Sequence, residues 1–122
     1  EYGGDLRRIL DLPLEEARAK LLALPGVGYK TADVVLLFCA DKPVIPVDTH
    51  VNRTAKRLGF VDEESGYEEV RLSLQRYYPP EYYLDLHLLL ISLGREYCKA
   101  GKPLCERCPL RTYCSYATKL AG

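Results

Sequence analysis

The sequence contains no methionine and no tryptophan, and neither charge is in excess, since 17 basic side chains balance 17 acidic ones in 122 residues. This balance gives no indication of a nucleic-acid partner from composition alone. No apolar run is long enough to span a bilayer and no signal peptide is visible, so we expect an intracellular protein without a membrane partner. Because methionine is absent, the sequence does not begin at a start codon, and we expect it to be part of a longer protein.

Strand patterns, internal repeats and low-complexity tracts are also missing, and apolar residues instead recur at three- and four-residue steps. That spacing gathers apolar side chains on one face of a helix, so the sequence predicts an all-α protein. Five helices are expected, over about residues 13–24, 31–40, 48–58, 67–77 and 81–95. The last of these contains the run 88–91, which is apolar all round and is therefore expected in the core.

Local signals indicate where several of these helices begin and end. Asp11 is suited to cap the first helix and Pro13 to occupy its first turn. Gly59 is suited to end the third helix, because glycine readily adopts the left-handed conformation found there. Ser65 and Glu68 match the spacing of a capping box for the fourth helix.

The most distinctive stretch runs from Leu24 to Ala32 and reads Leu-Pro-Gly-Val-Gly-Tyr-Lys-Thr-Ala. Pro25 ends the preceding helix because it lacks a backbone N–H, and Gly26 and Gly28 permit backbone angles that a Cβ disfavours. The stretch therefore predicts a helix–hairpin–helix unit. Its backbone N–H groups lie at a helix N-terminus, where a phosphate group binds readily. The alternative is a simple turn between two core helices.

Four of the five cysteines lie near the C-terminus with the spacing Cys98-x6-Cys105-x2-Cys108-x5-Cys114. An intracellular protein seldom uses such spacing for disulfides, whereas four thiolates can converge on one metal centre. They suit either a four-iron, four-sulfur cluster or a structural zinc ion. Zinc ribbons usually contain two Cys-x-x-Cys pairs and this sequence has one, so the spacing favours the cluster. Cys39 is expected to be an inert thiol in the core.

Two charged residues are expected at the starts of helices. Asp48 lies in the stretch Val-Asp-Thr-His, where a carboxylate caps the helix and the helix dipole favours its anionic form. Lys30 lies in the first turn after the hairpin, where the dipole disfavours a cation and so favours the free, nucleophilic amine. Considered alone, an aspartate in such a position is more often a simple helix cap, and a lysine is more often a solvent-facing side chain.

Taken in order, the hairpin, the Val-Asp-Thr-His stretch and the four cysteines resemble the endonuclease III family of DNA repair glycosylases, over residues 14–114. Lys30 stands where the lyase members of that family carry their catalytic lysine, and Asp48 where the family carries its essential aspartate. Adenine-removing relatives typically have serine at the lysine position, and a thymine-mismatch branch has tyrosine there. The chain departs from the family at Tyr29, where many bacterial members have a basic residue.

The resemblance implies a helix–hairpin–helix glycosylase fold without its first helices, divided into a partial helical domain over 1–95 and a cysteine loop over 96–122. The implied cofactor is a 4Fe–4S cluster held by the four cysteines, with zinc as the alternative. The implied partner is double-stranded DNA containing damaged bases or abasic sites, bound by a monomer in the cytoplasm or nucleoid of a prokaryote. DNA contacts are expected from Gly26, Val27, Gly28, Tyr29, Thr31, Lys99, Lys102, Arg107 and Arg111.

In the intact parent protein the implied reaction is removal of a damaged base, with an oxidised pyrimidine as the expected substrate, followed by cleavage of the strand. This chain alone is expected to be weak or inactive. Lys30 would attack the sugar and Asp48 would stabilise the positive charge that develops there. Three alternatives stay open. They are a monofunctional mismatch or adenine-type glycosylase, a non-catalytic helix–hairpin–helix DNA-binding module, and a zinc-stabilised interaction domain. Lys30 argues against the first and Asp48 against the second, while the colour of the protein decides the third.

Overall fold

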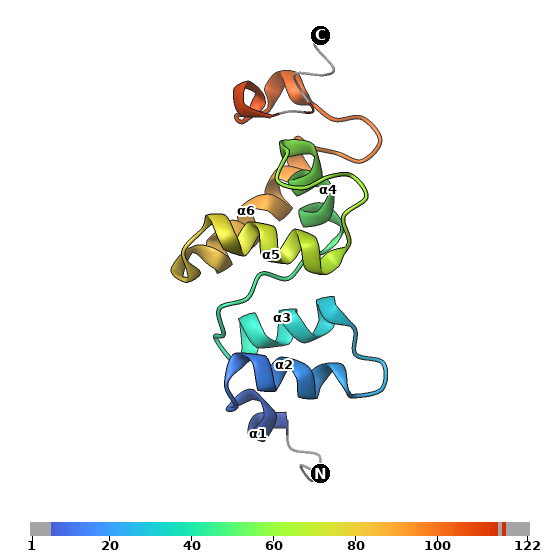
Figure 1. Ribbon diagram of the computed structural model, residues 1–122. Helices are drawn as coiled ribbons and strands as arrows, with labels where there is room; N and C mark the ends of the chain where they lie inside the picture. The colour runs from blue at the N-terminus through green and yellow to red at the C-terminus, as the bar shows by residue number, and fades with distance from the viewer. Residues whose placement is uncertain (1–5, 115, 117–122) are drawn as a thin grey trace. The chain divides into compact units, whose positions relative to one another are not determined.

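Helices form all of the regular secondary structure in a computed structural model of the chain, which describes residues 6–114 and 116 (Figure 1). The expected all-α class is therefore confirmed. The chain divides into two compact units, Glu1–Pro46 and Val47–Gly122. The separate cysteine loop over 96–122 stays a prediction, and positions 115 and 117–122 of it lie outside the described residues. Within the described part, no helix has the length and apolar character that crossing a membrane requires.

The first unit contains α1 (Leu6–Leu10), α2 (Leu14–Leu22) and α3 (Tyr29–Cys39), and α2 packs against α3 (Figure 1). Its core is apolar and comprises Ile9, Ala17, Leu21, Ala32, Leu36, Leu37 and Val44. Val27, in the hairpin between the two helices, packs against this core and is half-buried. The hairpin is thus anchored by an apolar side chain while its glycines stay at the surface.

Three expectations for the first unit are wrong. Pro13 is the N-cap residue of α2 and Asp11 does not cap it, because a proline with extended backbone ends the preceding turn there. The helix also ends at Leu22, before the turn that contains Pro25. Cys39 is exposed rather than buried, because α3 buries the face that carries Leu36 and its helical neighbours and Cys39 lies off that face.

The second unit contains α4 (Thr49–Leu58), α5 (Tyr67–Tyr77), the short helix η1 (Pro80–Tyr82) and α6 (Tyr83–Glu96). Helix α4 packs closely against α6, since a Cβ built on Gly94 would lie 2.9 Å from the Cβ of His50. The buried residues of the three long helices include Val51, Thr54, Ala55, Val70, Leu74, Leu86, Leu90 and Leu93.

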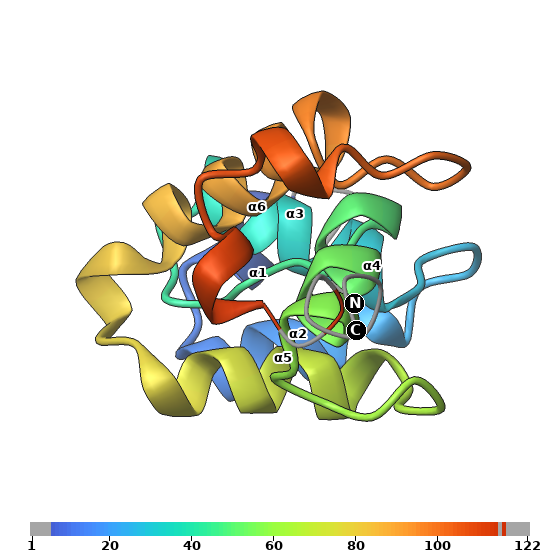
Figure 2. The same ribbon diagram turned by 90° about the horizontal axis from the view of Figure 1, so that it is seen from above.

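The segment after α6 forms two short helical turns, η2 (Cys105–Arg107) and η3 (Arg111–Tyr113). In Figure 1 this segment, coloured orange to red, lies beside the C-terminal ends of α4 and α6, and Figure 2 shows it from above. Hydrogen bonds from Arg53 and Arg57 connect α4 to this segment, and Cys114 of the segment donates to the carbonyl of Arg57. The cysteines are thereby carried by a segment that is tied to a regular helix.

One local expectation for the second unit is confirmed and another is wrong. Gly59 ends α4 with a φ of 99°, a left-handed conformation that favours glycine. The expected capping box is not formed, because Gly66, which has no side chain, is the N-cap of α5. Only the reciprocal bond is present, from the Gly66 N–H to Oε1 of Glu69 at 3.4 Å. Ser65 and Glu68 do not form the expected pair.

The apolar run in α6 does not lie wholly in the core. Leu88 and Leu89 are 48% and 66% exposed, whereas Leu90 is 4% exposed. Only one face of α6 packs against its neighbours within this chain, and residues two positions apart on a helix point in different directions. An all-round apolar run therefore indicates a helix with apolar faces but does not say which of them is covered.

Candidate functional site

The hairpin between α2 and α3 is built as the sequence predicts. Gly26 has a φ of 81°, which favours glycine, and the Val27 N–H donates to the carbonyl of Leu24 at 3.2 Å to close the turn. Gly28 is the N-cap residue of α3 and its carbonyl accepts from the N–H of Ala32 at 3.0 Å. A Cβ built on either glycine meets no atom within 4 Å, so the turn is open to a ligand.

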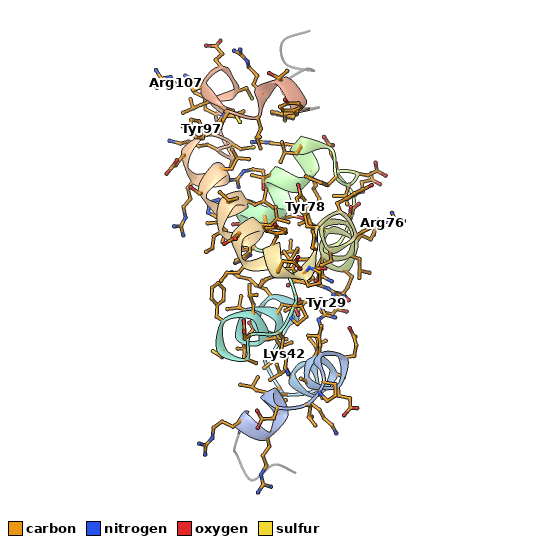
Figure 3. All side chains as sticks on the ribbon, turned by 90° about the vertical axis from the view of Figure 1, so that its left-hand side faces the viewer. Tyr29, Lys42, Arg76, Tyr78, Tyr97 and Arg107 are labelled. Carbon is orange, nitrogen blue, oxygen red and sulfur yellow. The ribbon has the colours of Figure 1, made fainter. Side chains whose placement is uncertain are left out.

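The first turn of α3 presents Tyr29, Lys30 and Thr31, all of them exposed (Figure 3 labels Tyr29). The ring of Tyr29 lies under the guanidinium of Arg18, whose Cζ is 5.4 Å from the ring centroid. Arg18 also binds the buried carboxylate of Asp33 on α3. The orientation of this turn is therefore tied to α2, and Lys30 is at the surface at the N-terminus of a helix.

Asp48 is the N-cap residue of α4, as predicted. Its Oδ1 accepts a hydrogen bond from the N–H of Val51 at 2.8 Å, and the side chain is half-buried. The N–H of Val47, just before it, donates to the hydroxyl of Tyr67 at 3.1 Å. Both bonds fix the backbone around the carboxylate, and the positive end of the helix dipole favours an anion there.

Lys30 belongs to the first unit and Asp48 to the second. Each is placed by its own helix, and the positions expected from the sequence are confirmed for each helix separately. Their joint action in one reaction stays a prediction.

The four C-terminal cysteines line one small cavity together with Leu58, Leu93, Tyr97 and Tyr116. All four are free thiols. Burial raises the pKa of the Cys105 thiol, the other three cysteines raise it further, and the guanidinium of Arg57 lowers it. In the described part of the chain, no three His, Cys, Asp or Glu side chains gather tightly around a single ion position. The described residues thus bring the four cysteines to one cavity without gathering them around one ion position, and the 4Fe–4S type of the centre stays a prediction.

The predicted basic contacts lie on the same segment as these cysteines and are exposed: Lys99, Lys102, Arg107 and Arg111. Arg107 points away from the segment (Figure 3). The carbonyl of Lys99 accepts a hydrogen bond from Arg57, and Arg111 donates to the carbonyl of Glu106 at 3.3 Å. Their charges face solvent, and their contact with DNA stays a prediction.

Sequence reasoning missed the residues that hold these parts in place. Arg18 and Tyr67 support the hairpin helix and the Asp48 turn, while Arg53 and Arg57 connect α4 to the cysteine segment. The only available signal was the four-residue spacing of the two α4 arginines, which places them on one face of the helix. Their partners lie more than 40 residues away in the sequence, where no spacing rule reaches.

Comparison with known proteins gives one consistent result. Residues 98–114 match the family model described as the iron-sulfur binding domain of endonuclease III. The chain is 40% identical over 116 residues to endonuclease III of Sulfolobus acidocaldarius, covering 95% of this chain and 52% of that protein. It is 41% identical over 119 residues to the Bacillus subtilis protein, covering 98% and 51%. The chain thus spans about half the length of the curated relatives it matches.

Solved structures agree with this result. A trapped covalent intermediate of endonuclease III with DNA matches with a TM-score of 0.80 and 42% identity, over 86% of this chain and 49% of that one. A non-covalent endonuclease III–DNA complex matches with a TM-score of 0.79 and 31% identity, over 97% and 72%. A thermostable thymine-DNA glycosylase matches less well, with a TM-score of 0.69 and 28% identity over 84% and 48%.

Proposed function

The chain belongs to the endonuclease III family, and from that premise we propose that it carries the catalytic residues and the iron–sulfur centre of a bifunctional DNA glycosylase and abasic-site lyase. The observation that carries the proposal is the position of Lys30, which is exposed in the first turn of α3 directly after an open glycine turn. One solved relative is a covalent enzyme–DNA intermediate, which is the species that a nucleophilic lysine forms.

In the proposed reaction the free amine of Lys30 attacks the anomeric carbon of the damaged nucleotide. The bond between that carbon and the base breaks, and the base leaves with the electron pair and takes up a proton. Opening of the sugar ring, with a proton taken up by the ring oxygen, gives a protonated Schiff base between Lys30 and that carbon. Loss of a proton from C2′ then drives β-elimination, in which the bond to the 3′ oxygen breaks and the phosphate leaves with the electron pair.

Asp48 supplies the opposite charge. As the N-cap of α4 its carboxylate is held by the Val51 N–H. A fixed anion beside the sugar stabilises the positive charge that develops as the base leaves. In this proposal Asp48 also helps to activate the nucleophile.

DNA is bound mainly through its phosphates. The N–H groups of Gly26, Val27 and Gly28, at the start of α3, would hold one phosphate without reading sequence. The exposed cations of the cysteine segment, Lys99, Lys102, Arg107 and Arg111, would contact others. The substrate class expected from the family is an oxidised pyrimidine in double-stranded DNA.

The four cysteines would hold a 4Fe–4S cluster, whose chemistry is structural or redox-sensing and takes no part in base removal. Substituting serine for Cys108 should therefore remove iron and sulfide and unfold the cysteine segment. The matched control is Cys39→Ser, because Cys39 is exposed on α3 and lines no part of the cysteine cavity. Stoichiometric zinc in a colourless protein would replace this proposal with the zinc alternative.

Trapping with borohydride tests the nucleophile. The intact protein that carries this chain is incubated with a duplex containing an abasic site, and the reduced adduct is mapped by peptide mass. We expect the adduct on Lys30, and we expect Lys30→Ala to lose both adduct and strand cleavage while Lys42→Ala, in the same unit, keeps them (Figure 3 labels Lys42). If Lys30→Ala cleaves abasic DNA at the rate of the unsubstituted protein and the adduct maps to another residue, Lys30 is not the nucleophile.

A second measurement separates lyase from glycosylase activity. Asp48→Asn should slow release of an oxidised pyrimidine by at least ~10²-fold, the usual effect of losing a preorganised electrostatic group. Base release without strand cleavage by the unsubstituted protein would identify a monofunctional glycosylase instead. Duplexes carrying a G·T mismatch, or adenine opposite oxidised guanine, distinguish the mismatch and adenine-type alternatives.

A further inference from the structure

Helix α4 holds the start of the cysteine segment through two arginines on one face. Nε of Arg53 donates to the carbonyl of Cys98 at 2.9 Å, and its Nη2 donates to the carbonyl of Gly94 at 3.1 Å. One turn later, Arg57 donates from Nη1 to the carbonyl of Lys99 at 2.8 Å. These bonds cross from α4 to the end of α6 and the residues that follow it.

Arg57 differs from Arg53 because it also reaches sulfur atoms. Its Nη1 lies 3.5 Å from Sγ of Cys98, and its Nη2 donates to the carbonyl of Ala100 at 3.2 Å. Its own carbonyl accepts from the thiol of Cys114 at 3.3 Å. The guanidinium also stacks over the ring of Tyr116, with Cζ 4.5 Å from the centroid. One residue of α4 therefore contacts both the first and the last cysteine of the set.

The hydrogen bonds of the Arg57 guanidinium hold its positive charge in a fixed position. The side chain is half-buried, and its forked guanidinium bonds two successive carbonyls, those of Lys99 and Ala100, so that it cannot swing away without breaking both bonds. This arrangement fixes a positive charge beside a cavity lined by four thiol groups. Thiolates bound to iron carry negative charge, and hydrogen bonds to sulfur together with nearby charge set the reduction potential of such centres.

We propose that Arg57 is a positioning residue of the iron–sulfur centre. Its charged N–H···S bond to Cys98 raises the reduction potential of the centre, and its bonds that clamp residues 98–100 to α4 slow the loss of the cluster from the protein. The inference rests on the proposed iron–sulfur centre and concerns a residue that is not one of its ligands. Reduction adds an electron and makes the centre more negative, so a fixed cation stabilises the reduced state more than the oxidised one. Removing the charge should shift the potential to more negative values.

The test uses Arg57→Gln, with Lys56→Gln as the matched control. Lys56 is the preceding residue of α4, carries the same charge, and lines the same open surface cavity as Arg57. The midpoint potential is measured by electrochemical titration of the purified protein, and cluster loss by the decay of visible absorbance in the presence of an iron chelator. We expect Arg57→Gln to have a more negative midpoint and about tenfold faster loss, the lower end of the effect of removing a residue that supports metal ligands.

Arg57→Lys separates charge from geometry. It keeps the cation but not the forked bonds to two carbonyls. We expect a potential nearer to that of the unsubstituted protein than Arg57→Gln shows, together with faster cluster loss. If Arg57→Gln fails to fold by circular dichroism, this variant decides the question, because unchanged cluster retention in Arg57→Lys contradicts the clamp.

The outcomes distinguish this inference from the proposed function. A potential and a loss rate that match those of Lys56→Gln in both Arg57 variants overturn the role of Arg57 and leave the centre itself intact. A parent protein without iron and sulfide overturns the centre and this inference with it. Base removal and lyase activity are assayed separately, so their absence overturns the glycosylase proposal even where the potential shifts as expected.

Discussion

The carboxylate of Asp33 accepts two hydrogen bonds from the guanidinium of Arg18, from Nε at 2.7 Å and from Nη2 at 3.1 Å. Both side chains are buried, and the pair joins α2 to α3 on the two sides of the hairpin. Arg18 lies in turn against the ring of Tyr29, one residue before Lys30. A buried ion pair thus helps to fix the orientation of the first turn of α3.

Breaking this pair should destabilise the protein strongly. Asp33→Ala leaves the buried guanidinium without its carboxylate, and removal of one member of a buried ion pair costs about 3–5 kcal/mol. Replacing both residues, in Arg18→Met with Asp33→Leu, should cost less, because no charge then stays buried. Urea unfolding of the two variants measures the difference. A double variant that is less stable than Asp33→Ala would show that the pair is not what stabilises this packing.

The close contact between Gly94 on α6 and His50 on α4 gives another prediction. A Cβ at Gly94 would lie 2.9 Å from Cβ and Nδ1 of His50 and 3.2 Å from Nη2 of Arg53, so Gly94→Ala forces α4 and α6 apart. Overpacking of this kind costs about 1–3 kcal/mol. Gly101→Ala is the control, because a Cβ there meets no atom within 4 Å. Thermal unfolding should show a lower midpoint for Gly94→Ala alone, and equal midpoints would contradict the packing described.

Several features that depend on a single turn could be predicted from the sequence, although the Asp11 cap and the Ser65–Glu68 pair were not among them. Asp48 as an N-cap and Gly59 as a C-terminal stop follow from side-chain reach and from the φ that each position requires. The hairpin could be predicted in the same way, because proline restricts the backbone conformation around it and glycine permits conformations that other residues disfavour. The order of three such motifs was then specific enough to indicate the family.

Features that depend on which face of a helix is covered by a neighbour could not be predicted from the sequence. Periodicity shows that Leu88, Leu89 and Cys39 lie on apolar helices, but not which helix face meets a neighbour. The contacts of Arg57 with residues 98–100 join parts of the chain more than 40 positions apart. An arginine on a helix usually faces solvent, so only the folded structure separates Arg57 from the other cations.

Stability should decrease above about pH 10, and Tyr83 should account for part of that decrease. Tyr83 is 6% exposed and its hydroxyl donates to the carbonyl of Gln75 at 3.0 Å. Burial raises the pKa of Tyr83 above its usual 10.0, although the nearby charge of Arg71 partly lowers it. Because the folded pKa lies above the unfolded one, the stabilisation is complete below pH 10 and is lost as the pH rises through the folded pKa.

Urea unfolding at several pH values checks this contribution. The free energy of unfolding of Tyr83→Phe should be lower than that of the parent near neutral pH, and it should fall less steeply above about pH 10. Tyr113→Phe is the control, because Tyr113 is 82% exposed and should leave the profile unchanged. Identical slopes for Tyr83→Phe and the parent at alkaline pH would assign the decrease to other groups.

Binding to DNA should depend on salt through the exposed cations of the cysteine segment. Lys99, Lys102 and Arg107 are all exposed, and an exposed cation that contacts a phosphate releases condensed counterions when the complex forms. Alanine at any of the three should therefore lower the slope of log affinity against log salt by about one for each phosphate that the variant no longer binds. The affinity should fall equally for damaged and undamaged duplexes, because phosphate contacts position the protein without reading the base. Arg76→Ala is the control, since Arg76 is exposed on α5 (Figure 3), and an unchanged slope in all three alanine variants would remove this segment from the DNA interface.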